Sequence, residues 1–180
     1  SSGDVWSVEV GSSVVMSSEV TFVSRRELRF SLPAGVGSSV GVRVRSRSGE
    51  WSNALFLSYD RPELARVDPP YGLAGAHNAT FVLCGANLGF ADTHTDWVRL
   101  GGHVMGDVRL LNASCVAAWS ARLPDPWPQP DDADVSVGGQ TAVRTQGLFE
   151  GIVRPSISLL SSTTRPTAGG SAVSVLGEGF

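Results

Sequence analysis

The sequence predicts an all-β fold made of antiparallel β-sandwiches. Three observations indicate it: apolar residues recur with a period of two, turn signals separate the short apolar runs, and the chain resembles itself at a spacing of about 92 residues. No stretch has the helical period of 3.6 together with caps. No apolar run reaches the roughly 20 residues that a membrane-spanning helix needs, so we expect no membrane insertion in this segment.

The alternating runs predict the individual strands. Val8, Val10 and then Val14 alternate with polar residues. Two further runs do the same, Leu28 to Leu32 and Val40 to Val44. Strands with one buried face produce this pattern. Turn signals lie between the runs, at Pro33-Ala34-Gly35, Ser48-Gly49, Pro69-Pro70-Tyr71-Gly72, Gly101-Gly102 and Gly138-Gly139.

Six landmarks recur in the same order at spacings of 90 to 93 residues. They are Val8–Gly11 with Val98–Gly101, Leu32-Pro33 with Leu123-Pro124, Val42–Val44 with Val135–Val137, Phe56 with Phe149, Arg61–Leu64 with Arg154–Ile157, and Phe81–Gly85 with Val173–Gly177. About 92 residues with roughly seven short strands are typical of one antiparallel sandwich. The chain is therefore expected to contain repeated modules.

The repeat predicts three parts. Residues 1–60 form the C-terminal part of one module, residues 61–154 a complete module, and residues 155–180 the start of a third. We expect the chain to be a piece of a longer protein. A lone pair of strands is marginal in water, so residues 155–180 are expected to pair with sequence beyond the chain or with a neighbouring molecule by strand addition.

These landmarks resemble IPT/TIG domains, the immunoglobulin-like modules of plexins, scatter-factor receptors, fibrocystin-like proteins and Rel-type transcription factors. The resemblance lies in an opening proline with an apolar residue (Pro62, Pro155), an apolar strand ending in glycine (Phe81–Gly85, Val173–Gly177) and the Leu123-Pro124 corner. It implies tandem immunoglobulin-like β-sandwiches, one complete and two partial. The segment Pro124–Asp134 departs from it as a longer, proline-rich insert.

Cys84 and Cys115 are the only cysteines, 31 residues apart within the complete module. The sandwich places both on strands of the same or facing sheets, so we expect a disulfide; two buried free thiols are the alternative. Closing a loop of this length stabilises by roughly 3–4 kcal/mol in the chain-entropy description.

Asn78-Ala79-Thr80 and Asn112-Ala113-Ser114 are glycosylation sequons without proline. With the paired cysteines they favour the secretory route and an extracellular or cell-surface location.

Candidate contact residues fall into two groups. Arg43, Arg45 and Arg47 alternate along one strand and share a face; they predict an anion- or partner-binding patch, or else a solvated face that discourages edge aggregation. Trp127 is flanked by prolines in the long insert, next to Asp131 and Asp132. We expect this tryptophan to be exposed and the three residues to contact a partner.

Signals for catalysis and metal binding are weak or missing. The sequence contains no nucleophile elbow, no HExxH and no P-loop. Asp92 and Asp96 match no EF-hand spacing, and the three histidines have no ligand spacing. A net charge of −3 argues against a nucleic-acid partner. We expect no enzyme activity and no cofactor.

The sequence therefore predicts a structural or adhesive segment of a large surface protein, in which the modules act as rigid spacers and interaction surfaces. Its partners would be neighbouring modules of the same protein and a protein or glycan at a surface. The alternatives are a ligand-recognition ectodomain, binding protein or glycan, and an accessory domain of a carbohydrate-active enzyme.

Overall fold

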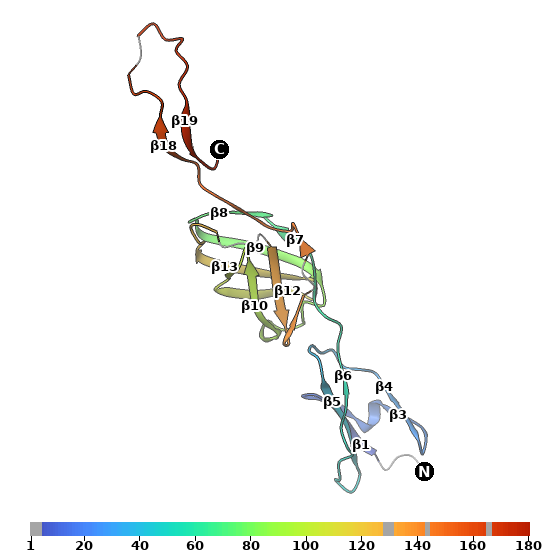
Figure 1. Ribbon diagram of the computed structural model, residues 1–180. Helices are drawn as coiled ribbons and strands as arrows, with labels where there is room; N and C mark the ends of the chain where they lie inside the picture. The colour runs from blue at the N-terminus through green and yellow to red at the C-terminus, as the bar shows by residue number, and fades with distance from the viewer. Residues whose placement is uncertain (1–4, 128–131, 143–144, 165–166) are drawn as a thin grey trace.

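The computed structural model describes residues 5–127, 132–142, 145–164 and 167–180. Figure 1 shows an elongated molecule with three parts in a row, the chain running from one end to the other. Its described residues form strands and two short 3₁₀ turns, η1 (Ser17–Glu19) and η2 (Asp92–His94). The prediction of an all-β fold is confirmed. No helix in these ranges is long and apolar enough to span a membrane.

The N-terminal part contains one four-stranded sheet and one hairpin. The sheet has the order β2-β1-β5-β6, and β3 pairs only with β4 among the described residues. The strands are β1 (Val5–Val10), β2 (Ser13–Met16), β3 (Val20–Ser24), β4 (Glu27–Phe30), β5 (Val40–Ser46) and β6 (Leu55–Leu57). Val8, Val10 and Val15 are buried between the sheet and the hairpin. Val14, expected on the same buried face as Val8, is exposed because the turn at Gly11 reverses the chain and brings Val15 inward.

The central part is a two-sheet sandwich. One sheet has the order β11-β10-β14-β15, with β16 also on β14, and the other has the order β12-β13-β9-β7. The strands are β7 (Glu63–Asp68), β8 (Tyr71–Leu73), β9 (His77–Ala86), β10 (Thr95–Leu100), β11 (His103–Val104), β12 (Asp107–Asn112), β13 (Cys115–Arg122), β14 (Asp132–Val137), β15 (Gln140–Thr141), β16 (Thr145–Gln146) and β17 (Glu150–Ile152). The last of these runs parallel to β8 and closes one end.

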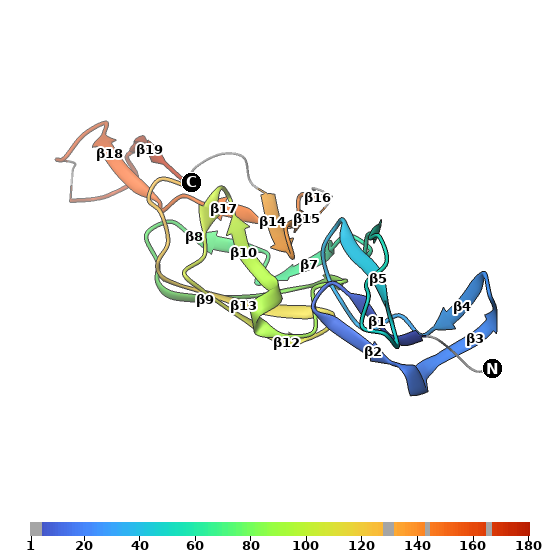
Figure 2. The ribbon, with the colours of Figure 1, turned by 90° about the horizontal axis from the view of Figure 1, so that it is seen from below.

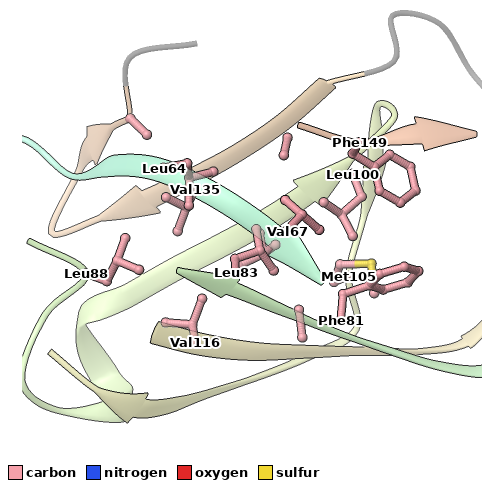
Figure 3. Close-up of a cluster of buried hydrophobic side chains, with 14 of the residues drawn as sticks. Leu64, Val67, Phe81, Leu83, Leu88, Leu100, Met105, Val116, Val135 and Phe149 are labelled. Atoms are coloured by element: carbon pink, nitrogen blue, oxygen red, sulfur yellow. The ribbon is translucent and has the colours of Figure 1, made fainter. Parts of the chain in front are cut away.

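The core of this sandwich is drawn from both sheets. Phe81 and Leu83 on β9 point toward Leu100 and Val135 of the facing sheet, and Phe149 closes one end of the cluster (Figure 3). Phe81 and Phe149 meet edge to face with ring centroids 5.5 Å apart. Burial of these side chains supplies the main driving force for the fold.

The C-terminal part is a single hairpin, β18 (Ser156–Leu160) and β19 (Val175–Glu178). It lies beyond the central sandwich, at the opposite end of the molecule from β1–β6 (Figure 1). Among the described residues no sheet joins strands across residue 60 or residue 154.

Several strands of the N-terminal and central parts are equivalent. The order β2-β1-β5-β6 parallels β11-β10-β14-β16, because β6 lies opposite Val40–Val42 of β5 and β16 lies opposite Asp132 and Ala133 of β14. The pairing of β1 with β5 slips between Val5 and Ser7, and that of β10 with β14 slips at the equivalent place, between Thr95 and Trp97. The hairpins β3–β4 and β12–β13 also share one irregularity next to a two-residue connection. The landmarks Val8–Gly11 and Val42–Val44 thus correspond to equivalent strands of the central part. The landmark Phe56 does not correspond to Phe149, because Phe56 is 71% exposed on β6 and Phe149 is buried in the central core.

Candidate functional site

The candidate site on the N-terminal sheet is the Arg–Trp surface, which we define as Glu9, Arg43, Arg45 and Trp51. Alternation along β5 turns Val40, Val42 and Val44 toward the core and leaves Arg43 and Arg45 on the outer face. Trp51 returns to this face through a backbone bridge to Arg45. Sequence reasoning missed this tryptophan as a member of the patch, although the turn signal Ser48-Gly49 places it back alongside β5.

Both arginine side chains pack against the aromatic ring of Trp51. The guanidinium of Arg43 lies 4.5 Å from the ring centroid and that of Arg45 lies 5.5 Å from it. The Nε and Nη2 groups of Arg43 also donate to the two carboxylate oxygens of Glu9 on β1, at 3.2 and 2.9 Å. The hydrogen bonds from Arg43 to Glu9 and the charge of Glu9 raise the pKa of Arg43 above its ordinary value. Trp51 stays 42% exposed although both guanidinium groups lie over its ring, so part of the indole surface faces solvent next to two cations.

Arg47 follows the end of β5 in the turn, where it lines a small hollow of about 240 Å³ with Arg45, Ser46 and Gly49. Of the three predicted arginines, Arg43 and Arg45 pack against Trp51, and Arg47 adjoins them through this hollow.

Trp127 is buried, and the expectation of an exposed contact residue is wrong. It is 6% exposed, its Nε1 donates to the carbonyl of Gly72 at 2.7 Å, and its ring meets Phe149 with centroids 5.1 Å apart. Burial at the end of the core removes the apolar surface of the indole ring from water, and the hydrogen bond to Gly72 satisfies its one polar atom. The buried position is therefore more stable than an exposed one.

Two acidic residues of the insert lie on a strand and not in a loop. β14 already begins at Asp132, and Asp132 and Asp134 are both buried. Asp132 is therefore not the exposed contact residue that the sequence predicted. Asp131 lies outside the described residues.

Cys84 and Cys115 form a disulfide. They stand directly opposite each other on β9 and β13, with their Cα atoms 4.1 Å apart, so the bridge links neighbouring strands of one sheet. Asn78 and Asn112 of the two sequons are exposed. Their glycosylation stays a prediction.

The remaining polar candidates serve the fold. The Asp92 carboxylate accepts a hydrogen bond from the backbone amide of Leu110. The Asp96 carboxylate accepts hydrogen bonds from the hydroxyl of Ser136 and the backbone amide of Gly139. His103 is hydrogen-bonded to Ser120 at 3.1 Å, and burial lowers its pKa. Among the described residues no three His, Cys, Asp or Glu side chains gather as a metal site would require.

The second candidate site is the junction between the N-terminal and central parts. Val36 packs against the core of the central sandwich, and Gln140 Nε2 donates to the carbonyl of Tyr59 at 3.2 Å. Tyr59 in turn donates through its hydroxyl to Pro33 and through its amide to Gly37. Beside these contacts lies a crevice of about 560 Å³, lined by residues of both parts, among them Leu32, Asp60, Asn87 and Phe90. Nothing in the sequence marks Tyr59 or Gln140 for this role.

No family model matches the chain, and no curated protein matches it. Several solved structures are similar to it. One is SGBP-B from a complex xyloglucan utilization locus in Bacteroides uniformis, at 15% identity over 82% of this chain and 42% of that one, with a TM-score of 0.39. Another is a crystal structure with xylogluco-oligosaccharide, at 12% identity over 81% and 34%, with a TM-score of 0.40.

A third is SGBP-B of the Bacteroides ovatus mixed-linkage glucan utilization locus in complex with a mixed-linkage heptasaccharide, at 11% identity over 93% of this chain and 45% of that one, with a TM-score of 0.35. The chain spans less than half the length of each of these structures.

Proposed function

We propose that this chain is a non-catalytic segment of an extracellular or cell-surface protein, in which β-sandwich modules act as a rigid spacer. The observation that carries the proposal is the packed junction, where Val36 contacts the central core and Gln140 holds Tyr59. A linker that is hydrogen-bonded and partly buried loses the freedom of a flexible tether. The disulfide supports an oxidising location. The modules are proposed to be of the IPT/TIG type.

A distance measurement across the junction tests the spacer. Spin labels on Val14→Cys and Val104→Cys, both exposed, report the separation of the N-terminal and central sheets. We expect one narrow distance distribution, because the junction fixes both parts. Val36→Ala with Gln140→Ala removes the packing and the hydrogen bond and should broaden the distribution, whereas the exposed Thr141→Ala control should leave it narrow. A broad distribution in the unaltered chain would contradict the spacer role.

The Arg–Trp surface favours a second function, recognition of a glycan. Sugar rings carry an apolar face of C–H groups and a rim of hydroxyls, so they pack on an exposed aromatic ring and hydrogen-bond to charged neighbours. Trp51 supplies the ring. Arg43 and Arg45 supply hydrogen-bond donors and Glu9 supplies acceptors, and the ion pair between Arg43 and Glu9 holds these two side chains in place.

Titration calorimetry with xyloglucan and mixed-linkage glucan oligosaccharides tests this second function. Trp51→Ala should abolish binding, and Trp119→Ala, which removes a comparably exposed tryptophan on β13, should not. Binding that survives Trp51→Ala, or an unaltered chain that binds neither glycan, would exclude this surface as a site for these sugars.

A further inference from the structure

The outer face of the N-terminal sheet carries two arginines that no carboxylate balances. Arg45 lies on β5 and Arg47 in the turn after it, and neither forms an ion pair among the described residues, not even with Glu50 of the same turn. The carboxylate of Glu9 is already engaged, because both of its oxygens accept hydrogen bonds from Arg43. Positive charge and hydrogen-bond donors are therefore in excess around Arg45 and Arg47.

Protection of a sheet edge does not explain these charges. β5 lies between β1 and β6 in the sheet, and Figure 2 shows it beside β1. Past the end of β6, the segment that returns through Trp51 covers the rest of β5, because the amide of Ser46 donates to Glu50 and the amide of Ser52 donates to Val44. Charges deter pairing with another chain where they stand on an edge strand, and β5 is an interior strand.

The two arginines line one hollow. Arg45 and Arg47 surround a volume of about 240 Å³ together with Ser46 and Gly49. The hydroxyl of Ser46 is already hydrogen-bonded to the hydroxyl of Ser48 at 2.7 Å, so the guanidinium groups are the main binding groups. Pockets that enclose a drug-sized ligand measure roughly 300–1,000 Å³. The hollow is smaller and fits a single charged group with its nearest atoms.

Arg45 is held in place by its neighbours in the chain. Its guanidinium lies 5.5 Å from the centroid of the Trp51 ring, and its Nε donates to the carbonyl of Gly49 at 3.4 Å. Its two terminal nitrogens form no hydrogen bond within the described part of the chain. A side chain that is already ordered loses less conformational entropy when a ligand binds. Arg45 thus presents its terminal N–H groups as a fixed fork.

The chemistry of these groups selects an anion. A guanidinium only donates hydrogen bonds, and an ionised carboxylate or sulfate ester only accepts them, so the two match without leaving an unpaired group. Such charge-assisted hydrogen bonds are about twice as strong as neutral ones. A sugar hydroxyl, in contrast, both donates and accepts. The exposed part of the Trp51 indole lies next to the arginines and suits the apolar face of the sugar ring that carries the charged group.

We propose that the Arg–Trp surface binds an anionic glycan. The carboxylate of a uronic acid, or the sulfate ester of a sulfated sugar, enters the hollow between Arg45 and Arg47, and the ring that carries it contacts Trp51. The inference rests on the proposed glycan function and names the ligand class of that site. It also gives Arg47 a role in binding, beside the four residues that define the surface.

Titration calorimetry with matched charged and uncharged oligosaccharides tests the ligand class. The probes are an oligogalacturonate, its methyl ester, a sulfated galactan oligosaccharide and its desulfated form. We expect a charged probe to bind at least about tenfold more tightly than its uncharged counterpart. This advantage should shrink as salt rises from about 0.1 M to about 1 M, because the Debye length falls from about 10 Å to about 3 Å. The tighter of the two charged probes identifies the group as a carboxylate or a sulfate ester.

Substitution of the arginines locates the charged group. Arg45→Gln and Arg47→Gln should each weaken binding of the charged probe by about tenfold or more and leave binding of the uncharged counterpart unchanged. Arg109→Gln removes an exposed arginine on β12, outside this surface, and is the matched control that should change neither. Thermal unfolding should be the same in all three variants, since each replaced side chain is exposed.

The outcomes separate this inference from the function on which it rests. Equal binding of charged and uncharged probes, lost in Trp51→Ala, would keep the glycan function and overturn the anionic class. Binding of no oligosaccharide at all would overturn both. Two further results would contradict the inference. Free sulfate or acetate that binds as tightly as the charged sugar would mark a site for small anions, and tighter binding of a polyglutamate peptide would mark a protein partner.

Discussion

The position of Trp127 in the fold differs from the one that its neighbours in the sequence suggest. Its prolines and acids indicate a solvated loop, yet the ring occupies the end of the core against Phe149. Glycines make this possible, because a Cβ on Gly72 or Gly151 would lie within 3 Å of the Trp127 side chain. Trp127 therefore stabilises the central sandwich.

Trp127→Ala should reduce the free energy of unfolding by about 3–5 kcal/mol, since it removes a buried aromatic side chain and leaves the Gly72 carbonyl without its donor. Urea denaturation followed by circular dichroism measures this loss. Trp119→Ala, at an exposed position, is the control and should cost much less. Equal losses in the two variants would contradict the buried assignment.

His103 predicts how stability depends on pH. Burial lowers its pKa below the ordinary value of 6.5. As pH falls through 6.5 the unfolded chain takes up this proton before the folded chain does, so stability decreases until the pH reaches the lowered pKa. His103→Gln keeps a partner for Ser120 without titrating, and should flatten this part of the profile. Unfolding between pH 7 and 5 checks it, with exposed His77→Gln as the control.

At the scale of the element, glycine decides where two strands approach each other. A Cβ on Gly85 would collide with the carbonyl oxygen of Glu63, so β7 and β9 pair closely only with glycine there. The irregular step between Leu64 and Arg66 lies at this contact. Gly177 repeats the arrangement in β19, which is why the two hairpins share one register.

Gly85→Ala should therefore destabilise the central sandwich by at least about 1–3 kcal/mol, because the backbone of β7 must shift away. Thermal unfolding is the measurement. Gly106→Ala is the matched substitution, since its Cβ would be 3.7 Å from the nearest atom, an ordinary contact. A Gly85→Ala chain as stable as Gly106→Ala would mean that the strands tolerate the added methyl group.

At the scale of the whole molecule, the parts follow one another in a row and are joined by short segments that contact their neighbours. Arg154 extends this behaviour to the second junction, where its Nε donates to the carbonyl of Ala74 at 2.8 Å. Both connections are therefore tied to the central sandwich.

The surface of the intact molecule should carry N-linked glycans. Asn78 and Asn112 are exposed, so a glycan on either site would point into solvent. Intact mass of the protein from its native source, before and after enzymatic glycan removal, should show a loss at one or both sites. Asn78→Gln and Asn112→Gln, alone and together, assign it. An unchanged mass, together with two free thiols, would place the chain inside the cell.

Period-two alternation and glycine turns are local consequences of backbone geometry, so the sequence alone predicts the fold class and several of the equivalent strands. It also indicated the outer face of β5, where Arg43 and Arg45 lie. The contacts between strands, loops and modules follow from the tertiary structure alone. The burial of Trp127 and Asp132 and the junction at Tyr59 and Gln140 depend on contacts between residues far apart in the sequence, which alternation along one strand does not encode.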